Sequence, residues 1–67
     1  MAMEYRWDAK AGCLMRFDRD KDVYEGYDWK SKKWEDYEDA FDASVGTYDG
    51  FLHKIDEQEA ERLIKEA

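Results

Sequence analysis

The chain has 67 residues, of which 43% are charged and 16% aromatic, and its formal net charge at neutral pH is −7. This length allows one domain at most, and so short a chain buries too little surface to be very stable. The negative charge argues against direct nucleic-acid binding, because phosphate groups are repelled by an acidic surface. The eleven aromatic residues recur at regular positions and indicate a folded chain rather than a disordered one.

The cysteine content and the hydropathy pattern limit where the protein can work. Cys13 is the only cysteine, so no disulfide forms within the chain, which fits a reducing compartment such as the cytosol. No apolar stretch is long enough to cross a membrane, and no secretory leader is recognisable. We therefore expect a cytoplasmic protein without membrane contact.

A ten-residue repeat dominates the first half of the chain. An aromatic residue followed by an acid recurs at Trp7-Asp8, Phe17-Asp18, Tyr27-Asp28 and Tyr37-Glu38. Ten residues suit one short strand and one turn, and an aspartate side chain can bond the backbone N–H two residues later to start that turn. The repeat predicts an antiparallel meander of three to four strands over residues 3–37.

Hydrophobic alternation suggests a register for the first hairpin. Pairing residues whose numbers add to 20 places six apolar or aromatic side chains on one sheet face. In that register Met3 lies opposite Phe17, Tyr5 opposite Met15, and Trp7 opposite Cys13. Trp7 is then mostly buried, Cys13 is a small core residue, and Gly12 takes the left-handed position of a five-residue turn.

The next two turns are less constrained by the sequence. Val23, Glu25, Tyr27 and Trp29 are expected to share a face, and the segment 29–34 is the third turn. Its register stays open, since Tyr27–Trp34 and Trp29–Trp34 pairings are both reasonable.

The stretch DRDKD, residues 18–22, has aspartates at alternate positions, like the start of an EF-hand calcium loop. Such a loop needs glycine at its sixth position and a bidentate glutamate at its twelfth. Counted from Asp18, those positions hold Val23 and Trp29. We therefore interpret Asp20 and Asp22 as turn residues between two strands and expect no metal site.

The C-terminal residues 56–66 are predicted to form a helix. Asp56 is its N-cap, Glu59 completes a capping box, and the apolar stripe consists of Ala60, Leu63, Ile64 and Ala67. Residues 38–54 form a connecting segment, in which 38–44 suits a short helix and the Asp-Gly pair at 49–50 suits a tight hairpin. The predicted fold class is α+β: one domain, residues 1–67, in which the C-terminal helix packs on a small antiparallel meander.

The sequence offers no convincing catalytic set. His53 is the only histidine, and a dyad with Cys13 is disfavoured if Cys13 lies in the core. Among eighteen acids some pairs will be close by chance, so a glycosidase-like carboxylate pair has little support. Glycine-rich phosphate loops and zinc-ligand spacings are absent from the sequence. We expect no enzymatic activity and no cofactor.

Charge is concentrated in the second half of the chain. Residues 1–34 carry eight Lys/Arg and seven Asp/Glu, whereas residues 35–67 carry three and eleven. Acids and rings alternate around residue 37, which suits either a solvated helix start or an anionic contact patch. The predicted partner-binding residues are Glu35, Asp36, Tyr37, Glu38, Asp39, Phe41, Asp42, Tyr24 and Trp34.

These features predict a small acidic interaction module that binds a basic surface of another protein. A sharper form of this hypothesis is an inhibitor or nucleic-acid mimic, in which carboxylates take the place of phosphates. The alternative is a structural domain that self-associates as a homo-oligomer through exposed rings of its sheet.

Overall fold

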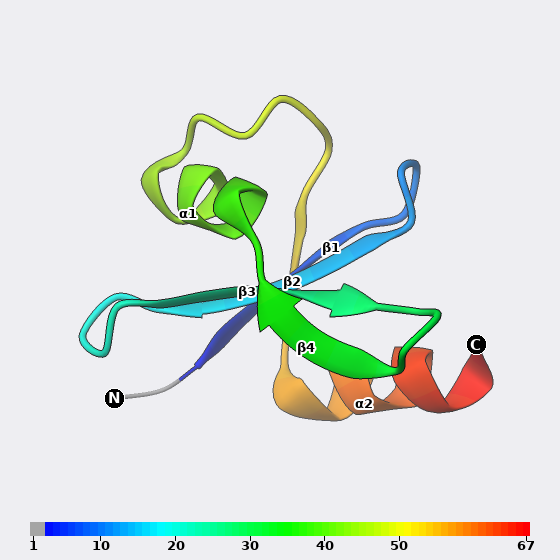
Figure 1. Ribbon diagram of the computed structural model, residues 1–67. Coiled ribbons are helices and arrows are strands. Elements are labelled where there is room, and N and C mark those ends of the chain that lie inside the picture. The colour runs from blue at the N-terminus through cyan, green and yellow to red at the C-terminus, as the bar shows by residue number, and fades with distance from the viewer. Residues whose placement is uncertain (1–2) are drawn as a thin grey trace.

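The protein is a five-stranded antiparallel sheet with one helix on each face (Figure 1). The computed structural model describes residues 3–67. Its strands are β1 (Glu4–Asp8), β2 (Cys13–Asp18), β3 (Val23–Asp28), β4 (Lys33–Asp36) and β5 (His53–Ile55), and its helices are α1 (Glu38–Val45) and α2 (Glu57–Glu66). The predicted α+β class, the meander and the C-terminal helix are confirmed, and the sheet has one strand more than predicted.

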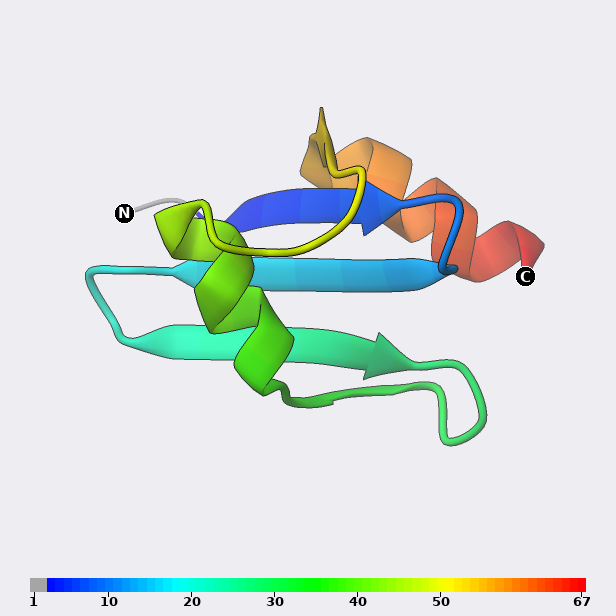
Figure 2. The ribbon, with the colours of Figure 1, turned by 90° about the horizontal axis from the view of Figure 1, so that it is seen from above.

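The order of the strands is β4-β3-β2-β1-β5, so the chain must cross the sheet once. The first four strands form the meander. After β4, helix α1 passes over β3 and β2, and the chain then reaches the outer side of β1 as β5 (Figure 2). Helix α2 lies on the opposite face, against β1. Neither helix between residues 3 and 67 is long and apolar enough to cross a membrane.

The three hairpin turns share one construction, which explains the ten-residue repeat. Each strand ends at an aspartate whose side chain accepts a hydrogen bond from the backbone N–H two residues later. Four loop residues follow, and the last of them has a positive φ, which is 71° at Gly12, 58° at Asp22 and 60° at Lys32. The predicted role of the aspartates and the left-handed Gly12 are confirmed, and so is the interpretation of residues 18–22 as a turn.

The register predicted for the first hairpin is wrong by one residue. Trp7 pairs with Leu14, not Cys13, and Tyr5 pairs with Arg16, not Met15. The turn itself decides this, because Asp8 pairs with Cys13 and leaves a four-residue loop rather than a five-residue one. Alternation misled the prediction because both faces of the sheet are covered by helices, so the alternating apolar side chains of β1 and those of β2 point to opposite faces.

The six side chains that were expected on one face therefore divide between the two faces. Met15 and Phe17, both fully buried, lie on the face beneath α1, together with the half-buried Cys13. Tyr5 and Trp7 lie on the other face, where Leu14 and Ala60 complete the buried cluster. Trp7 is mostly buried, as predicted, and packs against this cluster.

A chain of edge-to-face ring contacts covers the α2 side of the sheet. Trp7 meets Trp29, Trp29 meets Tyr27, Tyr27 meets Trp34, and Trp34 meets Tyr5, with ring centroids 5.0–6.2 Å apart. Tyr27 pairs with Trp34 in the β3–β4 ladder, which settles the register that the sequence left open. Trp29 lies in the turn, and its Nε1 donates to the Gly12 carbonyl at 2.9 Å, so the turns at this end of the sheet support each other.

Helix α2 begins as predicted. Asp56 is its N-cap and accepts a hydrogen bond from the Glu59 N–H at 2.8 Å, while the Glu59 carboxylate pairs with Arg62 instead of completing a capping box. Ala67, predicted as the end of the apolar stripe, lies beyond the helix and is exposed. In the connecting segment the short helix forms as α1, but the expected Asp-Gly hairpin does not, because residues 53–55 pair with β1.

Candidate functional site: an acidic groove beside helix α1

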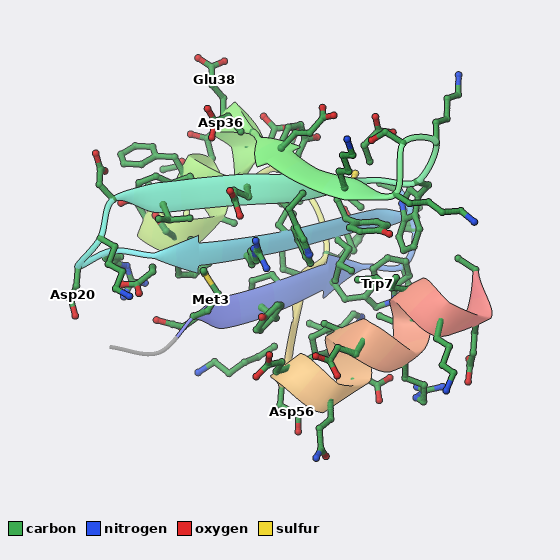
Figure 3. All side chains as sticks on the ribbon, turned by 60° about the horizontal axis from the view of Figure 1, so that its bottom comes forward. Met3, Trp7, Asp20, Asp36, Glu38 and Asp56 are labelled. Carbon is green, nitrogen blue, oxygen red and sulfur yellow. The ribbon has the colours of Figure 1, made fainter. Side chains whose placement is uncertain are left out.

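A groove of about 610 Å³ opens between β3, the β2–β3 turn and the first turns of α1. Four carboxylates and three rings line it: Asp22, Asp36, Glu38, Asp42, Tyr24, Tyr37 and Phe41. We call this the acidic groove. Its volume falls within the range of about 300–1,000 Å³ that is usual for ligand pockets. Figure 3 shows Asp36 and Glu38 side by side where β4 passes into α1, far from Asp56 at the start of α2.

The rings of the acidic groove are held by packing rather than left free. Tyr24 from β3 and Phe41 from α1 make an edge-to-face contact, with centroids 5.1 Å apart and planes at 78°. Phe41 nevertheless remains 48% exposed, which is unusual for so large an apolar side chain. This exposure gives a partner direct access to the ring.

Tyr37 forms the wall of the groove and joins β4 to α1. Its backbone N–H donates to the Tyr24 carbonyl at 3.1 Å, and its ring lies against β3 at Gly26. A Cβ atom at Gly26 would come within 2.6 Å of the Tyr37 ring, so glycine is needed there for the ring to fit. Burial, followed by hydrogen bonding to Asp39, raises the pKa of the Tyr37 phenol. The ring is therefore a fixed, uncharged part of the site at neutral pH.

The carboxylates of the acidic groove form no ion pair with the residues that the structure describes. Within residues 3–67, no lysine, arginine or histidine forms an ion pair with Asp22, Asp36, Glu38 or Asp42. Elsewhere in the molecule arginines neutralise acids: Arg16 pairs with Glu25 at 2.7 Å, and Arg6 pairs with Glu4 at 2.9 Å. The acidic groove thus concentrates uncompensated negative charge around exposed aromatic surface.

Six of the nine predicted partner-binding residues line this groove. They are Asp36, Tyr37, Glu38, Phe41, Asp42 and Tyr24. The other three lie elsewhere. Glu35 lines a second hollow of about 250 Å³, which Tyr37 also lines, and Asp39 is a hydrogen-bond partner of the Tyr37 phenol. Trp34 points to the opposite face of the sheet, where it packs against Tyr5 and Tyr27.

Sequence reasoning missed Asp22 as a lining residue. Its position at the end of the β2–β3 turn was interpreted correctly, but it lies fourteen residues from Asp36 along the chain. Only the pairing of β3 with β4 and the packing of α1 on β3 bring it to the groove. No local signal in the sequence marks it.

The other residues considered for chemistry are not brought together. His53 pairs with Trp7 on the α2 side of the sheet, whereas Cys13 pairs with Asp8 on the α1 side, so the sheet separates them. Cys13 lies in the second hollow, with its Sγ 4.0 Å from the Tyr37 hydroxyl. In the part of the chain that the structure describes, no three His, Cys, Asp or Glu side chains are arranged to hold a metal ion.

Comparisons with protein-family models, with curated proteins and with solved structures give no match for this chain.

Proposed function

We propose that the protein is a non-enzymatic acidic interaction module that binds a basic surface of a partner protein in the acidic groove. The observation that carries this proposal is the gathering in one concavity of three rings and four carboxylates that form no ion pair within residues 3–67. Like charges held together repel each other, so an arrangement of this kind is retained at some cost to stability. A basic partner would turn that repulsion into attraction, while the rings would supply apolar contact.

The lone Cys13 supports a place of action in a reducing compartment such as the cytosol. The same surface supports the inhibitor form of the proposal, in which the acidic groove covers the basic surface that a partner uses to hold DNA or RNA. We propose no direct binding of nucleic acid by this chain, since phosphates would meet the groove's own carboxylates.

The alternative proposal, self-association through the rings of the sheet, has less support. Trp34 is half-buried, and the Arg16 guanidinium lies 4.1 Å from its ring centroid, so the sheet offers little open aromatic surface. Strand β4 at the edge of the sheet carries Lys33, Glu35 and Asp36, and charged side chains at an edge discourage strand pairing. Two copies with a net charge of −7 would also repel each other.

The test is binding of a labelled peptide that mixes lysine and arginine, measured at low and at high salt. Screening shortens from about 10 Å at 0.1 M salt to about 3 Å at 1 M, so we expect affinity to fall at least about tenfold over that range. The triple variant Asp36→Asn, Glu38→Gln, Asp42→Asn should weaken binding at low salt by a similar factor.

A matched control separates the groove from the net charge. The triple variant Asp49→Asn, Glu57→Gln, Glu61→Gln changes the net charge equally but leaves the acidic groove intact. If both triple variants weaken binding equally, the attraction belongs to the whole molecule and the groove has no special role. Capture of a partner protein that DNA or RNA displaces competitively would support the nucleic-acid mimic. A dimer that persists at high salt in sedimentation would support the alternative.

A further inference from the structure

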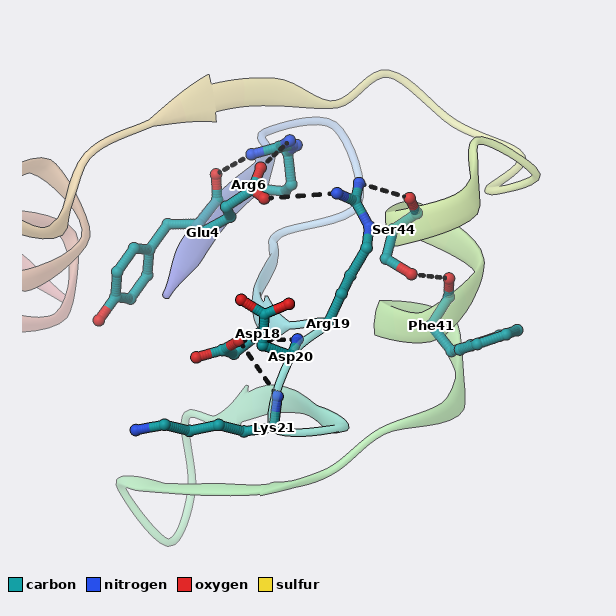
Figure 4. A network of polar contacts seen from close by, with 9 residues as sticks. Glu4, Arg6, Asp18, Arg19, Asp20, Lys21, Phe41 and Ser44 are labelled. Atoms are coloured by element: carbon teal, nitrogen blue, oxygen red, sulfur yellow. Dashed lines mark hydrogen bonds and ion pairs between the residues drawn. The ribbon is translucent and has the colours of Figure 1, made fainter. Parts of the chain in front are cut away.

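The protein's own arginines indicate what kind of cation suits a ring beside a carboxylate. Arg16 lies over the Trp34 ring at 4.1 Å and pairs with Glu25. Arg6 and Arg19 lie over Phe17, at 5.0 and 5.2 Å, and both pair with Glu4 (Figure 4). In all three cases one guanidinium contacts a ring and a carboxylate at once.

The single lysine over a ring behaves differently. Lys10 lies 5.4 Å from the Phe51 centroid and forms no ion pair with any of residues 3–67. The difference has a physical cause. A guanidinium is planar and weakly hydrated, so it can stack on a ring while its N–H groups, at its edges, donate to carboxylates. An ammonium is a compact, strongly hydrated charge that meets both demands less well.

The acidic groove repeats the ring-and-carboxylate half of this arrangement. Tyr24 and Phe41 form the ring pair, and the carboxylates that line the same groove, Asp22, Asp36, Glu38 and Asp42, form no ion pair within residues 3–67. We infer that the groove holds an arginine side chain of the partner, with its guanidinium against the Tyr24–Phe41 pair and hydrogen-bonded to these carboxylates. This inference rests on the proposed function and adds a specificity to it, which is arginine in preference to lysine.

The experiment compares two labelled octapeptides of equal charge, one alternating arginine with glycine and the other lysine with glycine. Fluorescence anisotropy at about 50 mM salt, where screening is weak, gives the two dissociation constants. The arginine peptide should bind about tenfold more tightly, from stacking and paired hydrogen bonds. Amide chemical shifts of Tyr24 and Phe41 should move on binding, which locates the peptide.

Phe41→Leu and Phe51→Leu form a matched pair of variants. Both replace an exposed phenylalanine, 48% and 68% exposed respectively, with another apolar side chain, so both should stay folded, which circular dichroism checks. Phe41→Leu should reduce the preference for arginine to about twofold or less while leaving lysine-peptide binding nearly unchanged. Phe51→Leu should keep the full preference, because Phe51 lies outside the acidic groove.

The outcomes separate this inference from the proposed function. If both peptides bind equally well, the arginine inference is overturned and the acidic module stands. If the preference for arginine survives in Phe41→Leu, the ring pair is not the binding surface and the inference is again overturned. If neither peptide binds at low salt, both the arginine inference and the proposed function fail.

Discussion

The two helices of this protein are of similar length but differ in how their charges are balanced. Helix α2 has a side-chain N-cap at Asp56, a basic residue in its last turn, and Arg62 paired with both Glu59 and Glu66. Helix α1 has no side-chain cap and no basic residue in its last turn. Glu38 and Asp42 place two like charges one turn apart on its surface, a spacing that destabilises a helix.

Helix α1 is held in place by contacts with the sheet instead. Arg19, from the β2–β3 turn, donates to the Ser44 carbonyl at 2.7 Å and so supplies the positive charge that the end of the helix lacks (Figure 4). Phe17, on β2, lies on the face that α1 covers. The comparison shows that α2 has a side-chain cap and compensating ion pairs, whereas the acids Glu38 and Asp42 of α1 have no ion pair within residues 3–67. Local rules are most often broken where a protein functions.

The largest expected effect on stability comes from a substitution in the core beneath α1, which tests whether that core holds the helix in place. Phe17 is fully buried, so Phe17→Ala should lower the free energy of unfolding by about 3–5 kcal/mol. That is much of the total stability of a small domain, and urea unfolding followed by circular dichroism measures it. Phe51→Ala, at a 68% exposed ring, should change stability by about 0.5 kcal/mol or less. Equal costs for the two variants would contradict the assignment of this core.

A smaller effect concerns the segment that follows α1. The Tyr48 hydroxyl donates to Asp8 Oδ2 at 2.8 Å, while Asp8 Oδ1 accepts from the backbone N–H groups of Ala11 and Lys10. The bond from Ala11, followed by that from Tyr48, lowers the pKa of Asp8 below 3.8. Burial, followed by the bond to Asp8, raises the pKa of Tyr48 above 10.0.

These two shifts affect stability at opposite ends of the pH range. The contribution of Asp8 is complete above pH 3.8 and is lost as the pH falls through its lower folded pKa. The contribution of Tyr48 is complete below pH 10.0 and is lost as the pH rises above that value. Melting temperature against pH should therefore fall at both ends, and Tyr48→Phe should reduce both falls. Some alkaline loss should remain, since burial also raises the pKa of Tyr37; an unchanged profile in Tyr48→Phe would show that this contact does not matter.

The smallest expected effects are changes in stability that have opposite signs for substitutions in the two helices. Asp42→Asn removes the repulsion from Glu38 and should stabilise the protein by about 0.2–0.5 kcal/mol at low salt. Glu66→Gln removes an exposed ion pair with Arg62 and should destabilise it by about as much. Urea unfolding at low and at high salt measures both, and both effects should shrink when salt is added. Destabilisation by Asp42→Asn would mean that its carboxylate has a favourable role in the fold, and the contrast between the helices would not hold.

What the sequence alone determined is local. Asp18 bonds a backbone group two residues away, Gly12 takes a left-handed conformation, and Asp56 caps a helix through a residue three positions later. Each contact spans only a few residues, so the neighbouring residues in the sequence are enough to predict it. The acids and rings around residue 37 are also close together in sequence, which is why five of the groove residues could be named from that one stretch.

What only the tertiary structure decided depends on segments that lie far apart in the chain. The register of the first hairpin could not be predicted, because α1 and α2 bury opposite faces of the sheet and the apolar residues of β1 and β2 therefore need not share a face. The position of Trp34 away from the groove, the presence of Asp22 in it and the pairing of β5 with β1 follow from the path of the chain across the sheet. Alternation tells which side chains share a face, but only packing between distant elements determines what covers that face.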